Sequence, residues 1–238
     1  MGVVRGILGT FAKGTVVVTS FGLGLALFAR PWPDSPIWTK PRELVQHKSF
    51  KSNLSISEQC AKLQSYEHFK DSSVFQKYIN DTSKNYVLFD MEKLIPAAHK
   101  YNQVSRGLLN LNDPIVLIDR KEGELVLFGK TANADIVGFD GKIHNGIVLT
   151  LLDESLCFCG FDKLPNKRGV TANLNVNFDG KLQPNSTFIL TAKVEDARGR
   201  KVKINGDIKS LNGDAVADAK CLLVEPKWFK WLTWVDLF

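Results

Sequence analysis

The apolar positions of the chain fall into three patterns. A stretch without any charge lies near the start, at 14–29, and a long apolar stretch at 142–160 predicts a buried helix. Short alternating or wholly apolar runs, separated by polar turns, predict strands. The predicted strands are 115–119, 124–130, 170–178, 188–196, 201–209 and 215–224. Two strands, one long helix and four strands in meander order predict an α+β fold, in which a curved antiparallel sheet wraps around a central helix.

The segment 170–178 has the clearest alternation. Asn173, Asn175 and Asn177 share one face of the predicted strand, and Leu174, Val176 and Phe178 share the other. Upstream, the residues from Ser57 to Tyr78 predict a helix with an apolar stripe, capped by Ser57 or Ser55. We expect four regions: a targeting or transmembrane anchor at 1–33, a linker and helical extension at 34–110, the α+β domain at 111–226 and a Trp-rich tail at 227–238.

The predicted central helix carries two adjacent carboxylates, Asp153 and Glu154, in apolar surroundings. An ionised carboxylate in such a place needs a hydrogen-bond donor or a shifted pKa. Adjacent helical residues point about 100° apart, so the two cannot serve one small pocket. Asp153 is therefore a candidate site residue and Glu154 a structural one. The alternative is that the helix has one wet edge and both acids face water.

Several separated motifs occur together with this helix. His144-Asn145-Gly146 lies at its start, Asp153 lies in its middle, and Thr171-Ala172-Asn173-Leu174-Asn175 follows; Glu195 to Lys201 forms a later charged turn. In this order they resemble the hotdog-fold thioesterases of the phenylacetic-acid-pathway type, with the mitochondrial members and fungal membrane-anchored relatives as the closest likeness. The resemblance covers about residues 110 to 225 and implies a hotdog fold that hydrolyses acyl-CoA.

The resemblance also implies roles for individual residues. Asp153 would attack the thioester or activate water as general base, with Thr171 bonded to the carboxylate or its water. The N–H groups of Asn145 and Gly146, oriented by His144, would hold the oxyanion at the helix start. The family pattern has glycine where Asn145 stands, so a side chain projects toward the thioester. Alternatively, His144 is only a helix cap and Thr171 only an ordinary strand residue.

The two halves of this implied site lie too far apart on one helix to meet. Nine residues from His144 to Asp153 span about 13.5 Å. In the family the two halves come from opposite subunits, so the resemblance implies a homodimer. Arg198, Arg200 and Lys201 would grip coenzyme A phosphates, although a charged hairpin turn is the more frequent meaning of such a run.

Composition limits the alternatives. With 238 residues, 44% of them hydrophobic, the chain can build one sizeable core. Arg5, Lys13 and Arg30 supply half of the net charge of +6, which argues against a nucleic-acid partner. The four cysteines and four histidines show no spacing typical of a metal site or a disulfide framework. We expect neither a metal nor a cofactor.

Residues 1–33 contain no acid, and their uncharged run at 14–29 is flanked by Lys13 and Arg30. Such a segment favours mitochondrial delivery and a single membrane span, completed by snorkelling of the flanking cations. All five Trp lie near the ends of the chain, and the tail 227–238 holds three of them. Since Trp prefers the boundary of water and lipid, the tail either lies on the membrane or packs on the domain.

Together these observations predict a membrane-anchored mitochondrial hotdog protein that hydrolyses acyl-CoA. A silent hotdog protein that binds acyl-CoA or lipid is the alternative that Asn145 and the apolar ends support. A second rival, an enoyl-CoA hydratase, lacks its usual acid–base pattern in this sequence.

Overall fold

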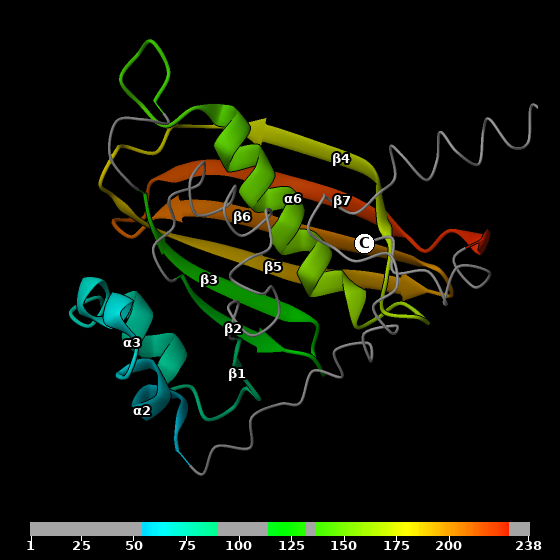
Figure 1. Cartoon of the computed structure of the whole chain (residues 1–238), viewed down its shortest axis with the longest axis horizontal. Coiled ribbons are helices and arrows are strands. Elements are labelled where there is room, and N and C mark those ends of the chain that lie inside the picture. Colours follow the sequence, from blue (N-terminus) through cyan, green and yellow to red (C-terminus); the bar gives the residue numbers. More distant parts are fainter. Residues whose placement is uncertain (1–53, 90–113, 132–136, 229–238) are drawn as a thin grey trace, which may run out of the picture. The chain divides into compact units, whose positions relative to one another are not determined.

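The computed structural model describes residues 54–89, 114–131 and 137–228 (Figure 1). Its elements, in chain order, are α2 (Ile56–Cys60), the 3-10 helix η1 (Gln64–His68), α3 (Ser73–Ile79), β1 (Val87–Phe89), β2 (Ile115–Asp119), β3 (Glu124–Lys130), α6 (Asn145–Phe161), β4 (Val170–Phe178), β5 (Thr187–Arg198), β6 (Lys201–Ser210) and β7 (Ala215–Val224). The predicted helix and the six predicted strands are all present, with ends shifted by no more than three residues.

The strands form one antiparallel sheet in the order β1-β2-β3-β5-β6-β7-β4. The meander prediction holds for β5, β6 and β7 but is wrong for β4, which pairs with β7 instead of β5. The reason is α6: the chain crosses the sheet along this helix and therefore starts β4 at the far edge. Among the described strands, β4 has only one neighbour, and its other edge is open.

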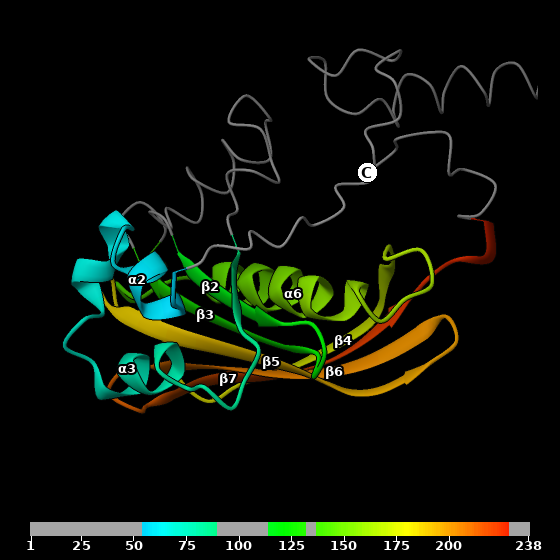
Figure 2. The same cartoon turned by 90° about the horizontal axis from the view of Figure 1, so that it is seen from below.

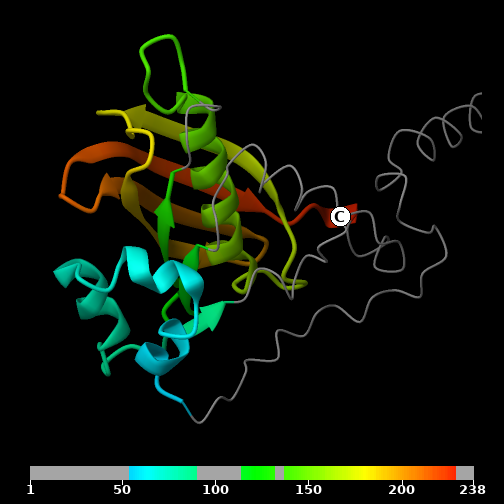
Figure 3. The same ribbon diagram turned by 60° about the vertical axis from the view of Figure 1, so that its left-hand side comes forward.

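Helix α6 lies across one face of the sheet (Figures 1 and 3). Its buried side chains recur with helical spacing and include Val148, Leu152, Leu156 and Cys159. They pack on the inward residues of the strands, which alternate with outward ones as the pleat requires. Gly206 lies under this helix, and a Cβ on it would come within 2.8 Å of the Leu156 side chain. The sheet thus supports the whole length of α6.

The N-terminal helices pack on the opposite face of β1, β2, β3 and β5, where a second core contains Phe69, Phe75 and Phe128 (Figure 2). The predicted continuous helix from 57 to 78 is wrong, because the chain forms three short helices there. Ser55 caps α2 in a capping box with Glu58, as predicted. A second cap at Ser72, whose hydroxyl accepts the Phe75 N–H, starts α3 as a new helix after η1 has ended at His68.

Within residues 54–89, 114–131 and 137–228, no helix combines the length and the apolar character that a membrane span requires. The predicted anchor at 1–33 lies outside the described residues, as do most of the linker and the tail from 229 onward.

Candidate active site

The start of α6 is fixed by the side chain of His144. This residue is the N-cap, with an extended backbone, and its Nδ1 accepts the Gly146 N–H at 3.0 Å. His144 is therefore a helix cap in this structure. Because Gly146 is bonded in this way, its N–H meets an incoming oxygen only if the imidazole turns aside.

Asn145, the first residue of α6, has an N–H group that donates no hydrogen bond to any described residue. An N–H group at a helix start lies at the positive end of the helix dipole. Its side chain is half-buried, and the Oδ1 atom is buried without a donor in the described part of the chain. Among the described residues, this position therefore offers one backbone donor without an acceptor and one side-chain oxygen without a donor.

Asp153 lies midway along α6 and is half-buried. Its Oδ1 accepts a hydrogen bond of 2.8 Å from the Thr171 hydroxyl, whereas Oδ2 accepts none from the described residues. Two predicted site residues that are 18 positions apart are thus in direct contact. The carboxylate is oriented by one oxygen and keeps the other available.

A bulge in β4 turns Thr171 toward the helix. The register of β4 on β7 shifts between Thr171 and Asn173, so that Thr171 pairs with the buried Leu223 and shares its inward face. The same hydroxyl also lies 3.2 Å from the sulfur of Cys157, one turn after Asp153 on α6. The sequence interpretation missed Cys157, although its spacing of four residues from Asp153 was a readable signal.

The two halves of the predicted site lie on one continuous helix and are not brought together within one chain. The face of α6 turned away from the sheet is only partly covered, and it carries polar residues such as the exposed Thr150 with apolar residues on its flanks. Leu149 is 39% exposed there, and Ile147 and Phe158 are half-buried. A partly covered helix face with exposed apolar side chains, beside an open strand edge, is a surface that another chain can cover.

The basic residues of the predicted phosphate grip lie at the β5–β6 turn. Arg200 donates to the Glu225 backbone carbonyl at 2.7 Å, and Arg198 pairs with Asp196 at 3.1 Å while remaining 85% exposed. Lys201 is exposed. Arg200 therefore has a structural contact, and the other two are parts of a charged turn near the C-terminal end of α6.

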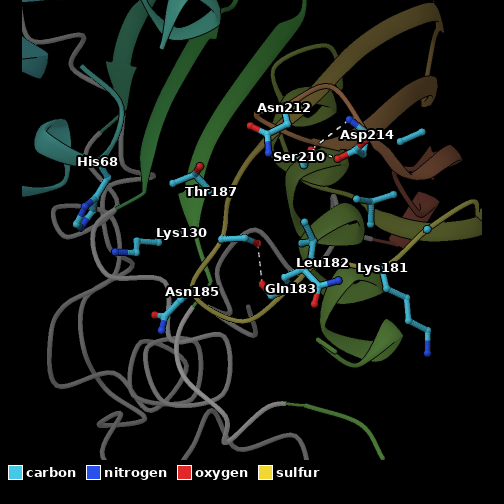
Figure 4. Close-up of a pocket in the computed structure, with 14 residues that line it drawn as sticks. His68, Lys130, Lys181, Leu182, Gln183, Asn185, Thr187, Ser210, Asn212 and Asp214 are labelled. Carbon is cyan, nitrogen blue, oxygen red and sulfur yellow. Dashed lines mark hydrogen bonds between the residues drawn. The ribbon is translucent and has the colours of Figure 1, made fainter. Parts of the chain in front are cut away.

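A cavity of about 550 Å³ lies elsewhere, at the end of the sheet near the β6–β7 turn (Figure 4). His68, Lys130, Asn185, Thr187 and Asp214 are among the residues that line it. It contains none of the predicted site residues.

Residues 140–217 match the thioesterase superfamily. Over 96% of its length the chain is 36% identical to a Candida albicans protein called "Uncharacterized protein, mitochondrial", of which it covers 99%. The chain is 33% identical to "MIOREX complex component 3" of Saccharomyces cerevisiae, with 92% of each chain covered. The chain belongs to the thioesterase superfamily. Its segment 140–217 includes His144, Asn145, Asp153 and Thr171, so the candidate site lies inside the part that carries the family likeness.

Two solved structures are similar to this chain at lower sequence identity. The Escherichia coli PaaI protein of the phenylacetic acid degradation operon is 16% identical, with a TM-score of 0.46, covering 56% of this chain and 92% of its own. A hypothetical thioesterase of Streptococcus pneumoniae with coenzyme A is 18% identical, with a TM-score of 0.38, covering 43% and 80%.

Proposed function

We propose that this protein hydrolyses acyl-CoA thioesters as a homodimer, with Asp153 as general base or nucleophile. The observation that carries the proposal is the contact between Asp153 and Thr171, because it orients the carboxylate without using both of its oxygens. The free Oδ2 is suited to accept a proton from water or to attack a carbonyl carbon. Membership in the thioesterase superfamily supports thioesters as the substrate class.

The oxyanion of the tetrahedral intermediate requires a donor that is not already bonded. The Asn145 N–H at the start of α6 is such a donor, and the helix dipole favours negative charge there. We propose that the Asn145 N–H donates a hydrogen bond to the oxyanion. The Gly146 N–H donates a second one when the His144 side chain turns away. His144 then acts as the residue that orients the helix start.

Because the Asn145 N–H and Asp153 are far apart on one helix, a second copy has to bring them together. The open edge of β4 and the partly covered face of α6 are where we place it. We propose that the twofold axis lies perpendicular to α6, so that the two helices run in opposite directions and the start of one faces the middle of the other. Exposed apolar side chains such as Leu149 are then buried between them.

The name of the Candida albicans relative supports a mitochondrial location for this protein. We further propose that residues 1–33 deliver it there and anchor it in a membrane, where the Trp-rich tail contacts lipid. Arg198 and Lys201 remain our candidates for contacts with the phosphates of coenzyme A, together with the partly engaged Arg200.

Hydrolysis of a series of acyl-CoA esters by the full-length protein tests the proposal, with release of free coenzyme A as the measurement. We expect Asp153→Asn to lower kcat by at least about 100-fold, because it removes the base or nucleophile. Glu154→Gln is the matched control, since its carboxylate belongs to the adjacent residue and points to another side of the helix. It should retain most of the activity. Equal kcat values for Asp153→Asn and the unchanged protein would refute the assignment.

Asn145 supports a second candidate function, in which the protein binds acyl-CoA or lipid without cleaving it. Its side chain stands where the family pattern has glycine, close to the proposed place of the thioester. Asn145→Gly keeps the backbone N–H and removes that side chain. The binding function is supported if the unchanged protein binds acyl-CoA tightly without releasing coenzyme A and Asn145→Gly does release it. A protein that is active with Asn145 in place is the hydrolase.

A further inference from the structure

The Thr171 hydroxyl has two polar neighbours and one proton to give. Its oxygen lies 2.8 Å from Asp153 Oδ1 and 3.2 Å from the Cys157 sulfur. A carboxylate only accepts, so the Thr171 proton goes to Asp153. The oxygen of Thr171 then remains as an acceptor, and the Cys157 S–H is the donor that faces it.

Three elements hold these groups together. Cys157 follows Asp153 by four residues, which places both side chains on one face of α6. The bulge in β4 presents Thr171 to that face. Behind the pair lies the buried Cys221 of β7, which pairs with Leu174 in the neighbouring strand.

We propose that Cys157 is a positioning residue for hydrolysis, whose S–H donates to the Thr171 oxygen and so commits the Thr171 proton to Asp153. The hydroxyl proton can rotate about its C–O bond, and sulfur is the weaker of its two acceptors. Donation by Cys157 removes the orientation that points at sulfur. Asp153 Oδ1 then stays occupied and Oδ2 stays available. The inference rests on the proposed function for its effect on rate, but the hydrogen bond itself does not.

Kinetics of three variants of the full-length protein test the effect on rate. We expect Cys157→Ala to lower kcat by about 5-fold, which corresponds to the loss of one neutral hydrogen bond. KM should change by less than about two-fold. Cys157→Ser supplies a hydroxyl donor in the same place and should restore kcat to within about two-fold of the unchanged protein. Cys159→Ala is the matched control. It removes another buried thiol of α6, one that donates to the Gly123 carbonyl at 3.2 Å and does not touch Asp153.

A kcat unchanged in Cys157→Ala would overturn the positioning role. So would equal losses in Cys157→Ala and Cys157→Ser, because a serine hydroxyl would then fail to replace the thiol as donor. A drop in Cys159→Ala as large as that in Cys157→Ala would show that any cavity in α6 slows the reaction, and would overturn it as well.

Infrared spectroscopy tests the hydrogen bond without reference to activity, since the S–H stretch of thiols lies apart from other protein bands. The Cys157 band is identified by its loss in Cys157→Ala. In Thr171→Val, which has the shape of threonine without the acceptor, we expect this band to move to higher frequency. An unmoved band overturns the inference even in an active enzyme. A moved band in a protein that hydrolyses nothing would refute the proposed function and leave the hydrogen bond established.

Discussion

Asp119, a carboxylate outside the candidate site, shows how a single residue can couple folding to pH. It ends β2 and is fully buried, and it accepts hydrogen bonds from the backbone N–H groups of Asn85, Lys121 and Glu122 at 2.9 to 3.0 Å. Burial alone would raise its pKa. The three donors outweigh burial and hold the pKa of Asp119 below its ordinary value of 3.8. The charged form of Asp119 therefore closes the β2–β3 turn and fixes the segment before β1.

A carboxyl group whose pKa is lower in the folded protein adds stability above its unfolded pKa, and this contribution is lost as the pH falls through the folded value. We expect Asp119→Asn to cost about 2 kcal/mol of unfolding free energy at pH 7, since an amide cannot accept from all three donors. The difference should shrink as the pH falls below about 4, because Asp119 is protonated first in the unfolded chain and, at still lower pH, in the folded protein. Urea unfolding at pH 7 and pH 3 measures it. A constant difference at both pH values would contradict this explanation.

The candidate site could be read from the sequence only in part, for a physical reason. Asp153 stood out because a charge in an apolar helix needs a partner, and the structure supplies one in Thr171. The contact depends on a bulge that shifts the register of β4, which no alternation pattern contains. The donor role of Cys157 depends on where that bulge places Thr171. Residue spacing along α6 was visible, whereas distances across to β4 were not.

At the scale of the elements, the helices α2, η1 and α3 form a separate core with the outer face of the sheet. Phe75 is fully buried, with its ring centroid 4.9 Å from that of Phe128 in an edge-to-face arrangement. Such aromatic pairs add to the free energy of burial. This core lies on the sheet face opposite α6, so it stabilises the support of the site without touching Asp153 (Figure 2).

We therefore expect Phe75→Ala to lower the unfolding free energy by about 4 kcal/mol, as is typical for truncation of a buried phenylalanine. The KM of this variant should stay close to that of the unchanged protein. Val74→Ala is the control from the same helix, because Val74 is 36% exposed and should cost less than about 0.5 kcal/mol. Chemical unfolding and steady-state kinetics give the two quantities. A small loss of stability in Phe75→Ala would mean that the helical extension is not part of the folded core.

The elements themselves were more predictable than their arrangement. β2, β3, β4 and β7 begin and end where the apolar runs predicted, because each run is bounded by polar turn residues. β1, with only three residues, gives too short a pattern to read, and the helical extension failed because Ser72 interrupts an otherwise helical stripe. The place of β4 beside β7 is set by how far α6 carries the chain across the sheet, which is a tertiary property.

At the scale of the whole molecule, the proposed dimer divides the site between two chains, with Asp153 from one and the Asn145 N–H from the other. Asn145→Pro removes this N–H with little harm to α6, since proline suits the first helical position and His144 already has the extended backbone that precedes proline. Asn145→Gly, which keeps the N–H, is the matched control. We expect Asn145→Pro and Asp153→Asn to be inactive when each is expressed alone.

When these two variants are expressed together and assemble at random, half of the dimers contain one copy of each. In such a mixed dimer one site receives both altered residues and the other receives neither. We therefore expect coexpression to restore about a quarter of the activity of the unchanged protein, measured as coenzyme A release per chain. Coexpression of Asp153→Asn with Asp153→Ala should restore none. If each site belongs to a single chain, both sites of the mixed dimer are defective, and an inactive mixture would exclude the shared site.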